Sequence, residues 1–177
     1  VRANTYAYEG SSQNIHKLYS IASGNTSDEE RFARYTELAD SDYFMDYLIA
    51  TSYFISADYY NQKYTHTSDN AIKWRPLFYD LDLGFNGYNP RSSIFGKLFS
   101  STGIPLGEPE EDGTQNMVDT TLYYAFYRNP EWRGQFVRRY AQVMNTVLTQ
   151  QNMLSLFDDM VSAMRSEMPR TIERWGY

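Results

Sequence analysis

Apolar positions recur at helical spacing between residues 27 and 39. Ser27 stands before three consecutive acidic residues, and the third of them, Glu30, completes a capping box with it. Acidic side chains in a first turn also complement the positive end of the helix dipole. The sequence therefore predicts a helix after Ser27 with one buried stripe, which consists of Phe32, Tyr35 and Leu38.

A second helical pattern starts at Asp40-Ser41-Asp42 and runs to about Ala57. It is apolar around most of its circumference, and a helix of this kind is usually central to its domain. Asp58 follows it directly. The apolar positions are Phe44, Met45, Leu48, Ile49, Tyr53, Phe54 and Ile55.

Strand-like residues on both sides of a polar turn follow this helix. Residues 62–67 predict one strand, residues 68–71 a turn, and residues 72–79 the return strand of a hairpin. Pro76 removes one ladder hydrogen bond, so the return strand is expected to be an edge strand or to bulge there. Residues 84–114 show no regular pattern and hold six glycines and three prolines, which indicates a long functional or mobile loop.

Helical spacing returns in the last third of the chain. We expect a helix over residues 114–127 and another in which Asn129 caps and Pro130 takes the first position. Pro169 should kink or restart the last helix. The helix after Asn129 is expected to bury Trp132, Phe136, Val137, Tyr140, Met144 and Val147, and the last helix carries Met153, Leu156, Phe157, Met160, Val161 and Met164.

The elements add up to a mainly α protein with a small β-hairpin, an α+β fold. Residues 1–25 are polar and predict one short helix at most. A length of 177 residues suits a single domain with enough chain to bury a core.

Composition excludes several kinds of site and partner. The chain has no cysteine, which excludes disulfides, thiolate metal sites and cysteine nucleophiles. A net charge of -6 argues against nucleic acid as a partner, and we interpret Arg133, Arg138 and Arg139 as a solvated helix face. No apolar run is long enough to cross a bilayer.

Four oxygen-bearing side chains surround the predicted hairpin. Asp58 and Asn61 precede it, and Asp80 and Asp82 follow it. Because a hairpin returns the chain close to its start, we expect Asn61 and Asp80 to lie near each other. Asp80 and Asp82 would point the same way if the strand continues through them, or chelate an ion from two sides in a loop. Oxygen ligands of this kind suit Mg²⁺, which makes phosphoryl transfer a candidate function, although helix caps and turns explain the same residues equally well.

The amino-acid sequences of two segments closely resemble those of the CotH kinase family, which are atypical protein kinases related to spore-coat protein H. The segments run from Tyr53 to Tyr64 (YFISADYYNQKY) and from Trp74 to Phe85 (WRPLFYDLDLGF). Like the family pattern, they place an Asp and an Asn after a hydrophobic helix, and a Tyr-Asp-x-Asp segment before a Gly. The resemblance extends over residues 30–176, since the segments 128–133 and 173–176 look like the family's later helices.

The resemblance implies the helical C-lobe of a protein-kinase-like fold that uses Mg²⁺ and ATP to phosphorylate Ser or Thr of secreted, cell-surface or spore-coat proteins in bacteria. By the same resemblance, Asp58 would be catalytic, or share that role with metal binding. Asn61 would be a metal or phosphate ligand, and Asp80 and Asp82 would hold Mg²⁺.

Two departures from the family pattern stand out. Ser56 occupies a position that is often Asn in the family. Nothing in residues 1–25 matches the N-lobe segment whose charged residues clamp ATP, so we expect the N-lobe to be absent from this chain and the chain alone to bind nucleotide weakly.

Two other functions fit the sequence. A non-catalytic cell-surface module that binds carbohydrate or protein could keep the fold, because the many tyrosines suit such surfaces and Trp74 with Tyr59 and Tyr60 could form a sugar platform. A structural Ca²⁺ site at Asp80 and Asp82 is the third hypothesis.

Overall fold

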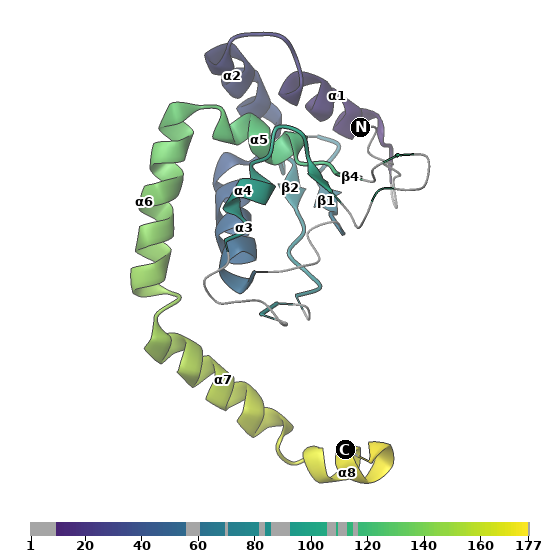
Figure 1. The fold of residues 1–177 in the computed structure, drawn as a ribbon, viewed down its shortest axis with the longest axis vertical. Coiled ribbons are helices and arrows are strands. Elements are labelled where there is room, and N and C mark those ends of the chain that lie inside the picture. The colour runs from purple at the N-terminus through teal and green to yellow at the C-terminus, as the bar shows by residue number, and fades with distance from the viewer. Residues whose placement is uncertain are drawn as a thin grey trace. The chain divides into compact units, whose positions relative to one another are not determined.

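The computed structural model describes residues 10–55, 61–69, 71–81, 84–85, 93–105, 109, 113–114 and 117–176. It divides into two compact units, Val1–Phe136 and Val137–Tyr177. The described residues are mainly helical, with two small antiparallel sheets, as the sequence predicts (Figure 1). The helices are α1 Gln13–Ala22, α2 Asp28–Leu38, α3 Ser41–Phe54, α4 Phe95–Leu98, α5 Thr121–Tyr127, α6 Pro130–Thr146, α7 Gln150–Met164 and α8 Met168–Trp175.

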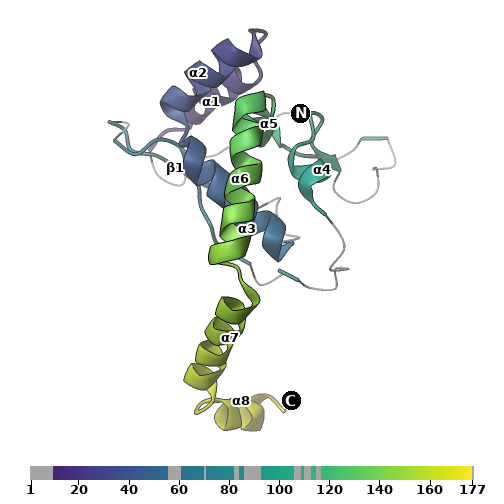
Figure 2. The same ribbon diagram turned by 90° about the vertical axis from the view of Figure 1, so that its left-hand side faces the viewer.

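Helices α1, α2 and α5 pack together in the first unit, and α1 and α2 lie side by side in Figure 2. The predicted start of α2 is confirmed, because Ser27 Oγ accepts the Glu30 backbone N–H at 3.1 Å. Of the predicted stripe, Tyr35 is fully buried, whereas Phe32 and Leu38 are half-buried. The short helix expected near the start of the chain is α1.

The core of the first unit is an aromatic cluster around Phe126. Its ring centroid lies 4.7 Å from that of Tyr35, 5.1 Å from that of Phe44 and 5.4 Å from that of Trp132. All four side chains are essentially inaccessible to solvent. Large rings of this kind account for much of the apolar area a domain buries, so this cluster joins α2, α3, α5 and α6.

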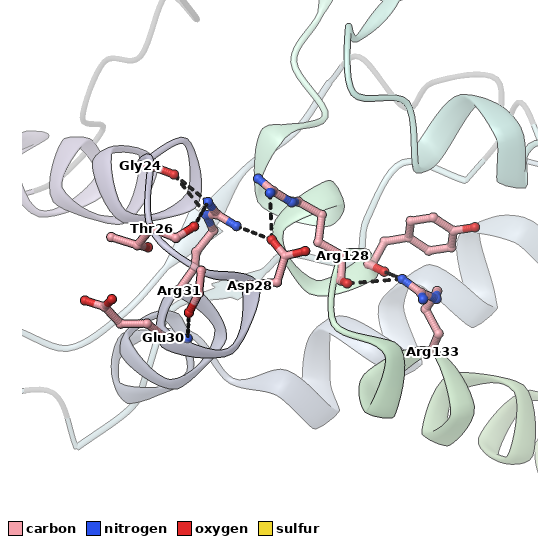
Figure 3. Close-up of polar contacts among 9 residues, drawn as sticks. Gly24, Thr26, Asp28, Glu30, Arg31, Arg128 and Arg133 are labelled. Atoms are coloured by element: carbon pink, nitrogen blue, oxygen red, sulfur yellow. Dashed lines mark hydrogen bonds and ion pairs between the residues drawn. The ribbon is translucent and has the colours of Figure 1, made fainter.

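One polar network fastens α2 to its neighbours (Figure 3). Arg31 is 2% exposed, and its guanidinium donates to the carbonyls of Gly24 and Thr26 at 2.6 and 2.7 Å. The same group lies 2.6 Å from Asp28 Oδ1, which also lies 2.6 Å from Arg128. The buried cation therefore has both a counter-charge and carbonyl acceptors, as burial of a charge requires.

The predicted hairpin is present but its ladder is shorter than expected. Strand β1, Tyr64–Thr65, pairs antiparallel with β2, Arg75–Pro76, with Tyr64 opposite Pro76. The Thr67 N–H and the Ile72 carbonyl extend the pairing toward the turn at 3.1 Å. The return segment is also held on its far side, where Ala39 and Trp74 form a parallel bridge.

Three predicted boundaries are wrong. The central helix α3 ends at Phe54 rather than at Ala57, because Ile55 adopts a left-handed conformation with φ 48°. The helix expected over residues 114–127 begins only at Thr121. The segment before it forms strand β4, Met117–Val118. This strand pairs with β3, Ile104–Pro105, and β3 lies inside the stretch 84–114 that was expected to be irregular.

The predicted start of α6 is confirmed. Asn129 Oδ1 accepts the Trp132 backbone N–H at 2.9 Å, and Pro130 is the first residue of the helix. Trp132 and Phe136 are buried as expected, but Val137 and Val147 are 66% and 58% exposed. The predicted apolar stripe is therefore buried only in its first part.

The second unit continues α6 into α7 and α8. Helix α7 ends at Met164 and α8 begins at Met168, with Pro169 in its first turn, so the predicted restart at Pro169 is confirmed. Thr149 caps α7 by accepting the Asn152 N–H at 3.2 Å. Among the described helices none is long and apolar enough to span a membrane.

Candidate functional site

The return segment of the hairpin runs beside α3 and in the same direction. Asp40 caps α3 by accepting the Tyr43 N–H, and its other oxygen accepts from Arg75 at 2.7 Å. Farther along, the rings of Tyr47 and Phe78 lie 6.0 Å apart. Figure 1 shows β2 beside α3.

The lengths of these two elements explain where Asp80 lies. Fourteen helical residues in α3 span about 20 Å at 1.5 Å per residue. Five steps from Arg75 to Asp80 cover a similar length, about 17 Å where the chain is extended. Because both start at Asp40 and Arg75, Asp80 is carried toward the C-terminal end of α3.

Asn61 and Asp80 contact each other, as the hairpin predicted. Asn61 Nδ2 donates to Asp80 Oδ2 at 3.1 Å, and both residues are exposed. Tyr79 adds a second tie, since its hydroxyl donates to the backbone carbonyl of Asn61 at 2.6 Å. Beyond the backbone hydrogen bond from Leu77 to Lys63, the mouth of the hairpin is thus closed by two side-chain hydrogen bonds.

The extended backbone does not continue through Asp80. Strand β2 ends at Pro76, and Asp80 has a left-handed φ of 58°. A positive φ is uncommon outside glycine, although Asp tolerates it better than most residues. The strand alternation considered for Asp80 and Asp82 therefore does not apply, and Asp80 belongs to a loop.

The chain after Asp80 folds back onto the end of α3. Gly84 N–H donates to the Leu81 carbonyl, and Phe85 N–H donates to the Phe54 carbonyl, each at 2.8 Å. A Cβ on Gly84 would lie only 2.9 Å from the Leu81 oxygen, so a glycine is needed in this turn. The rings of Tyr53, Phe54 and Phe85 contact one another edge to face at this point.

Asp58 and Asp82 lie outside the described residues, so their positions relative to Asn61 and Asp80 stay predictions. No group of three or more His, Cys, Asp or Glu side chains that could hold a metal is found within the described part of the chain. The pair that is described fits a hard cation in its chemistry, because an exposed carboxylate and an amide both offer oxygen ligands.

The neighbouring residue Gln62 anchors this mouth in the core. Its Oε1 accepts from the Tyr64 hydroxyl at 2.6 Å, and its Nε2 donates to the Asp119 carbonyl at 3.3 Å. The Tyr64 hydroxyl also lies 3.2 Å from that of Tyr123 on α5. Burial raises the pKa of both tyrosines well above the ordinary value of 10.0, so both hydroxyls stay protonated as hydrogen-bond donors.

Sequence reasoning did not identify Gln62, Tyr79 or Lys63 as parts of this mouth. Lys63 Nζ lies 4.3 Å from the centre of the Tyr79 ring. The pairing of strands in the predicted hairpin was the only signal in the sequence, since it puts residues near 62 opposite residues near 78.

The sugar platform expected from the sequence cannot include Trp74, which is 7% exposed and lies against His66 with ring centroids 3.9 Å apart. Tyr59 and Tyr60 lie outside the described residues.

The fold and this mouth define a mainly α protein with an exposed amide and an exposed carboxylate, those of Asn61 and Asp80, at the mouth of a short hairpin. Comparison with known families gives the class a name. The family model described as CotH kinase protein matches residues 2–177, and the chain belongs to the CotH family. Neither the curated proteins nor the solved structures contain a significant match.

Proposed function

We propose that the protein transfers phosphate from Mg·ATP to serine or threonine of secreted, cell-surface or spore-coat proteins. The observation that supports this most directly is the 3.1 Å contact between Asn61 and Asp80. It joins two of the three residues, Asn61, Asp80 and Asp82, for which the family resemblance implies a role in binding. Membership of the CotH family supports a kinase-like protein, and the finer activity is the proposal.

Each candidate residue has a role in this proposal. Asp58 orients or deprotonates the attacking hydroxyl, and Asn61, Asp80 and Asp82 supply the oxygen atoms that hold Mg²⁺ and the nucleotide. The ion supplies positive charge that offsets the charge of the phosphates. The chain itself contributes positioning, because Tyr79 holds the Asn61 carbonyl and the next residue, Gln62, is hydrogen-bonded to the Asp119 carbonyl.

The end of α3 adds to the electrostatic argument for a cation. The C-terminal end of a helix carries partial negative charge, which attracts cations. Phe85 and Gly84 hold the chain that follows Asp80 against Phe54, the last residue of α3. The chain that carries Asp80 therefore continues to the negative end of a fourteen-residue helix.

The organisation of the protein is also a proposal. We propose that these residues form the C-terminal, helical part of a CotH-like kinase domain in a bacterial secreted or surface protein. The partners are then ATP and a protein substrate. Purified residues 1–177 should bind Mg·ATP more weakly than a protein that also carries the clamping N-lobe, and equal affinities would contradict this point.

Isothermal titration calorimetry of the full-length protein with Mg·ATP tests the function. We expect Asp82→Ala and Asp80→Asn to abolish binding and phosphate transfer from radiolabelled ATP to serine or threonine of a protein. The matched control is Asp158→Asn, an exposed aspartate on α7 that should leave affinity unchanged. Equal affinity for Mg·ATP in the wild type and in Asp82→Ala would contradict the proposed function.

The same variants separate the two other functions. A glycan array or protein pull-down that stays positive in Asp80→Asn and Asp82→Ala, without nucleotide binding, would favour the non-catalytic module. Melting that depends on Ca²⁺, with no effect of nucleotide, would favour a structural calcium site.

A further inference from the structure

Lys63 is held at the mouth of the hairpin by its backbone. Its carbonyl accepts the Leu77 N–H at 2.8 Å, one step beyond the pair of Tyr64 and Pro76. This pairing places Lys63 close to the residues that follow Leu77. Lys63 is half-buried, so its long side chain is restrained more than that of a fully exposed lysine.

The ammonium group of Lys63 lies over the ring of Tyr79. The distance from Nζ to the ring centre is 4.3 Å, within the range of a cation–π contact. Tyr79 is itself fixed, because its hydroxyl donates to the Asn61 carbonyl at 2.6 Å. One ring therefore joins the ammonium of Lys63 to the backbone of Asn61, and the next residue in the chain is Asp80.

This arrangement adds a positive group to a mouth that otherwise offers oxygen ligands. Carboxylates attract a metal ion but repel phosphate oxygens. An ammonium is a compact point charge that suits phosphate, and charge-assisted hydrogen bonds to phosphate are stronger than neutral ones. A ligand that combines a divalent cation with several phosphates matches both groups.

We infer that Lys63 contacts the terminal phosphates of the bound nucleotide and makes the site prefer a triphosphate over nucleotides with fewer phosphates. The inference rests on the proposed function. Tyr79 is a positioning residue in it, because its ring contacts the ammonium while its hydroxyl holds the Asn61 carbonyl.

Calorimetry on the full-length protein with Mg·ATP, Mg·ADP, Mg·AMP and Mg²⁺ alone tests this role. Lys63→Met should weaken Mg·ATP binding about tenfold to a hundredfold, the effect of losing one charge-assisted hydrogen bond. It should weaken Mg·ADP less, and leave Mg·AMP and Mg²⁺ unchanged. Lys63→Arg keeps the charge and should restore most of the affinity for Mg·ATP.

The chain offers a matched control at the opposite end of the same hairpin. Lys73 is exposed and its Nζ donates to the Thr36 carbonyl at 2.6 Å. Lys73→Met removes the same charge from the protein, so it should leave all four titrations unchanged. Thermal melting of each variant checks that the fold is intact.

Tyr79→Phe separates the ring from its hydroxyl. The variant keeps the surface beneath Lys63 but loses the tie to Asn61, so we expect an intermediate loss of Mg·ATP affinity. Equal weakening of Mg·AMP and Mg·ATP by Lys63→Met, or equal weakening by Lys73→Met, overturns the inference while the proposed function stands. A wild-type protein that binds none of the nucleotides overturns both.

Discussion

Arg128, which follows α5, lies 2.6 Å from Asp28 in the first turn of α2. The same oxygen of Asp28 also accepts from the buried Arg31 at 2.6 Å. One carboxylate thus contacts two guanidinium groups that come from different parts of the chain (Figure 3). The packing of α2 against α5 therefore depends on an electrostatic contact as well as on apolar area.

Asp28→Ala should destabilise the protein by about 1–3 kcal/mol, because it leaves the buried Arg31 without its counter-charge. The expected loss is at the lower end for a buried pair, since the Asp28 side chain is 37% exposed. Urea unfolding measures the change. Glu29→Ala in the same helix turn is the control, because this exposed acid shares only the interaction with the helix dipole and should contribute less than about 1 kcal/mol. Similar losses in both variants would contradict this account.

The buried tyrosines predict a loss of stability at alkaline pH. Burial raises the pKa of Tyr35, Tyr64 and Tyr123 well above 10.0. The folded protein therefore holds these protons more tightly than the unfolded chain does. Their contribution to stability is complete below pH 10, the unfolded pKa, and is lost as the pH rises toward the folded pKa.

We expect the free energy of unfolding to be insensitive to these groups at neutral pH and to fall steadily above pH 10. Ultraviolet absorbance of tyrosinate, followed together with circular dichroism, measures both events. The buried tyrosines should ionise only as the protein unfolds. Titration of all 17 tyrosines near their ordinary pKa in a still folded protein would refute the prediction.

Gly103→Ala should destabilise the second sheet by about 3 kcal/mol. Its φ is 88°, and a Cβ would lie 2.6 Å from the Val118 carbonyl oxygen, so strain and a clash with β4 add together. Gly113→Ala is the control, because Gly113 has a φ of 80° but no atom of the described residues lies within 4 Å of the added Cβ. Its cost should be about 1 kcal/mol, from strain alone. Chemical denaturation gives both values, and equal costs would rule out the clash.

Asn61→Ala should separate binding from stability. The contact with Asp80 is exposed, so its loss should change the free energy of unfolding by less than about 0.5 kcal/mol. Mg·ATP affinity should fall about tenfold, because a residue proposed to bind or orient the metal is lost. Thermal melting with and without Mg·ATP checks both effects. Asn145→Ala on α6 is the control, and a large loss of stability without ligand would point to a structural role instead.

The parts of the fold that could be predicted from sequence rest on local signals. Ser27 and Asn129 cap helices through atoms three residues away, so their role is readable from spacing alone. The approach of Asn61 to Asp80 was predictable for a related reason, because a hairpin brings its two ends together whatever its ladder length.

The parts that sequence reasoning missed depend on distant partners. Val118 pairs with Ile104, and nothing local in residues 114–120 separates a strand from the start of a helix. The end of α3 depends on Phe85, whose N–H donates a hydrogen bond to the Phe54 carbonyl. Lys63 and Tyr79 are ordinary hairpin residues in the sequence, and only the fold brings the ammonium over the ring.

The hydrogen bond from Phe85 to Phe54 closes the chain between them into a loop whose ends are fastened together. All four candidate residues, Asp58, Asn61, Asp80 and Asp82, fall inside this loop. Extra residues at the hairpin tip would lengthen the loop at little entropic cost and leave both ends in place. Relatives could therefore differ widely in the length of the hairpin arm while Asn61 and Asp80 at its base keep their contact.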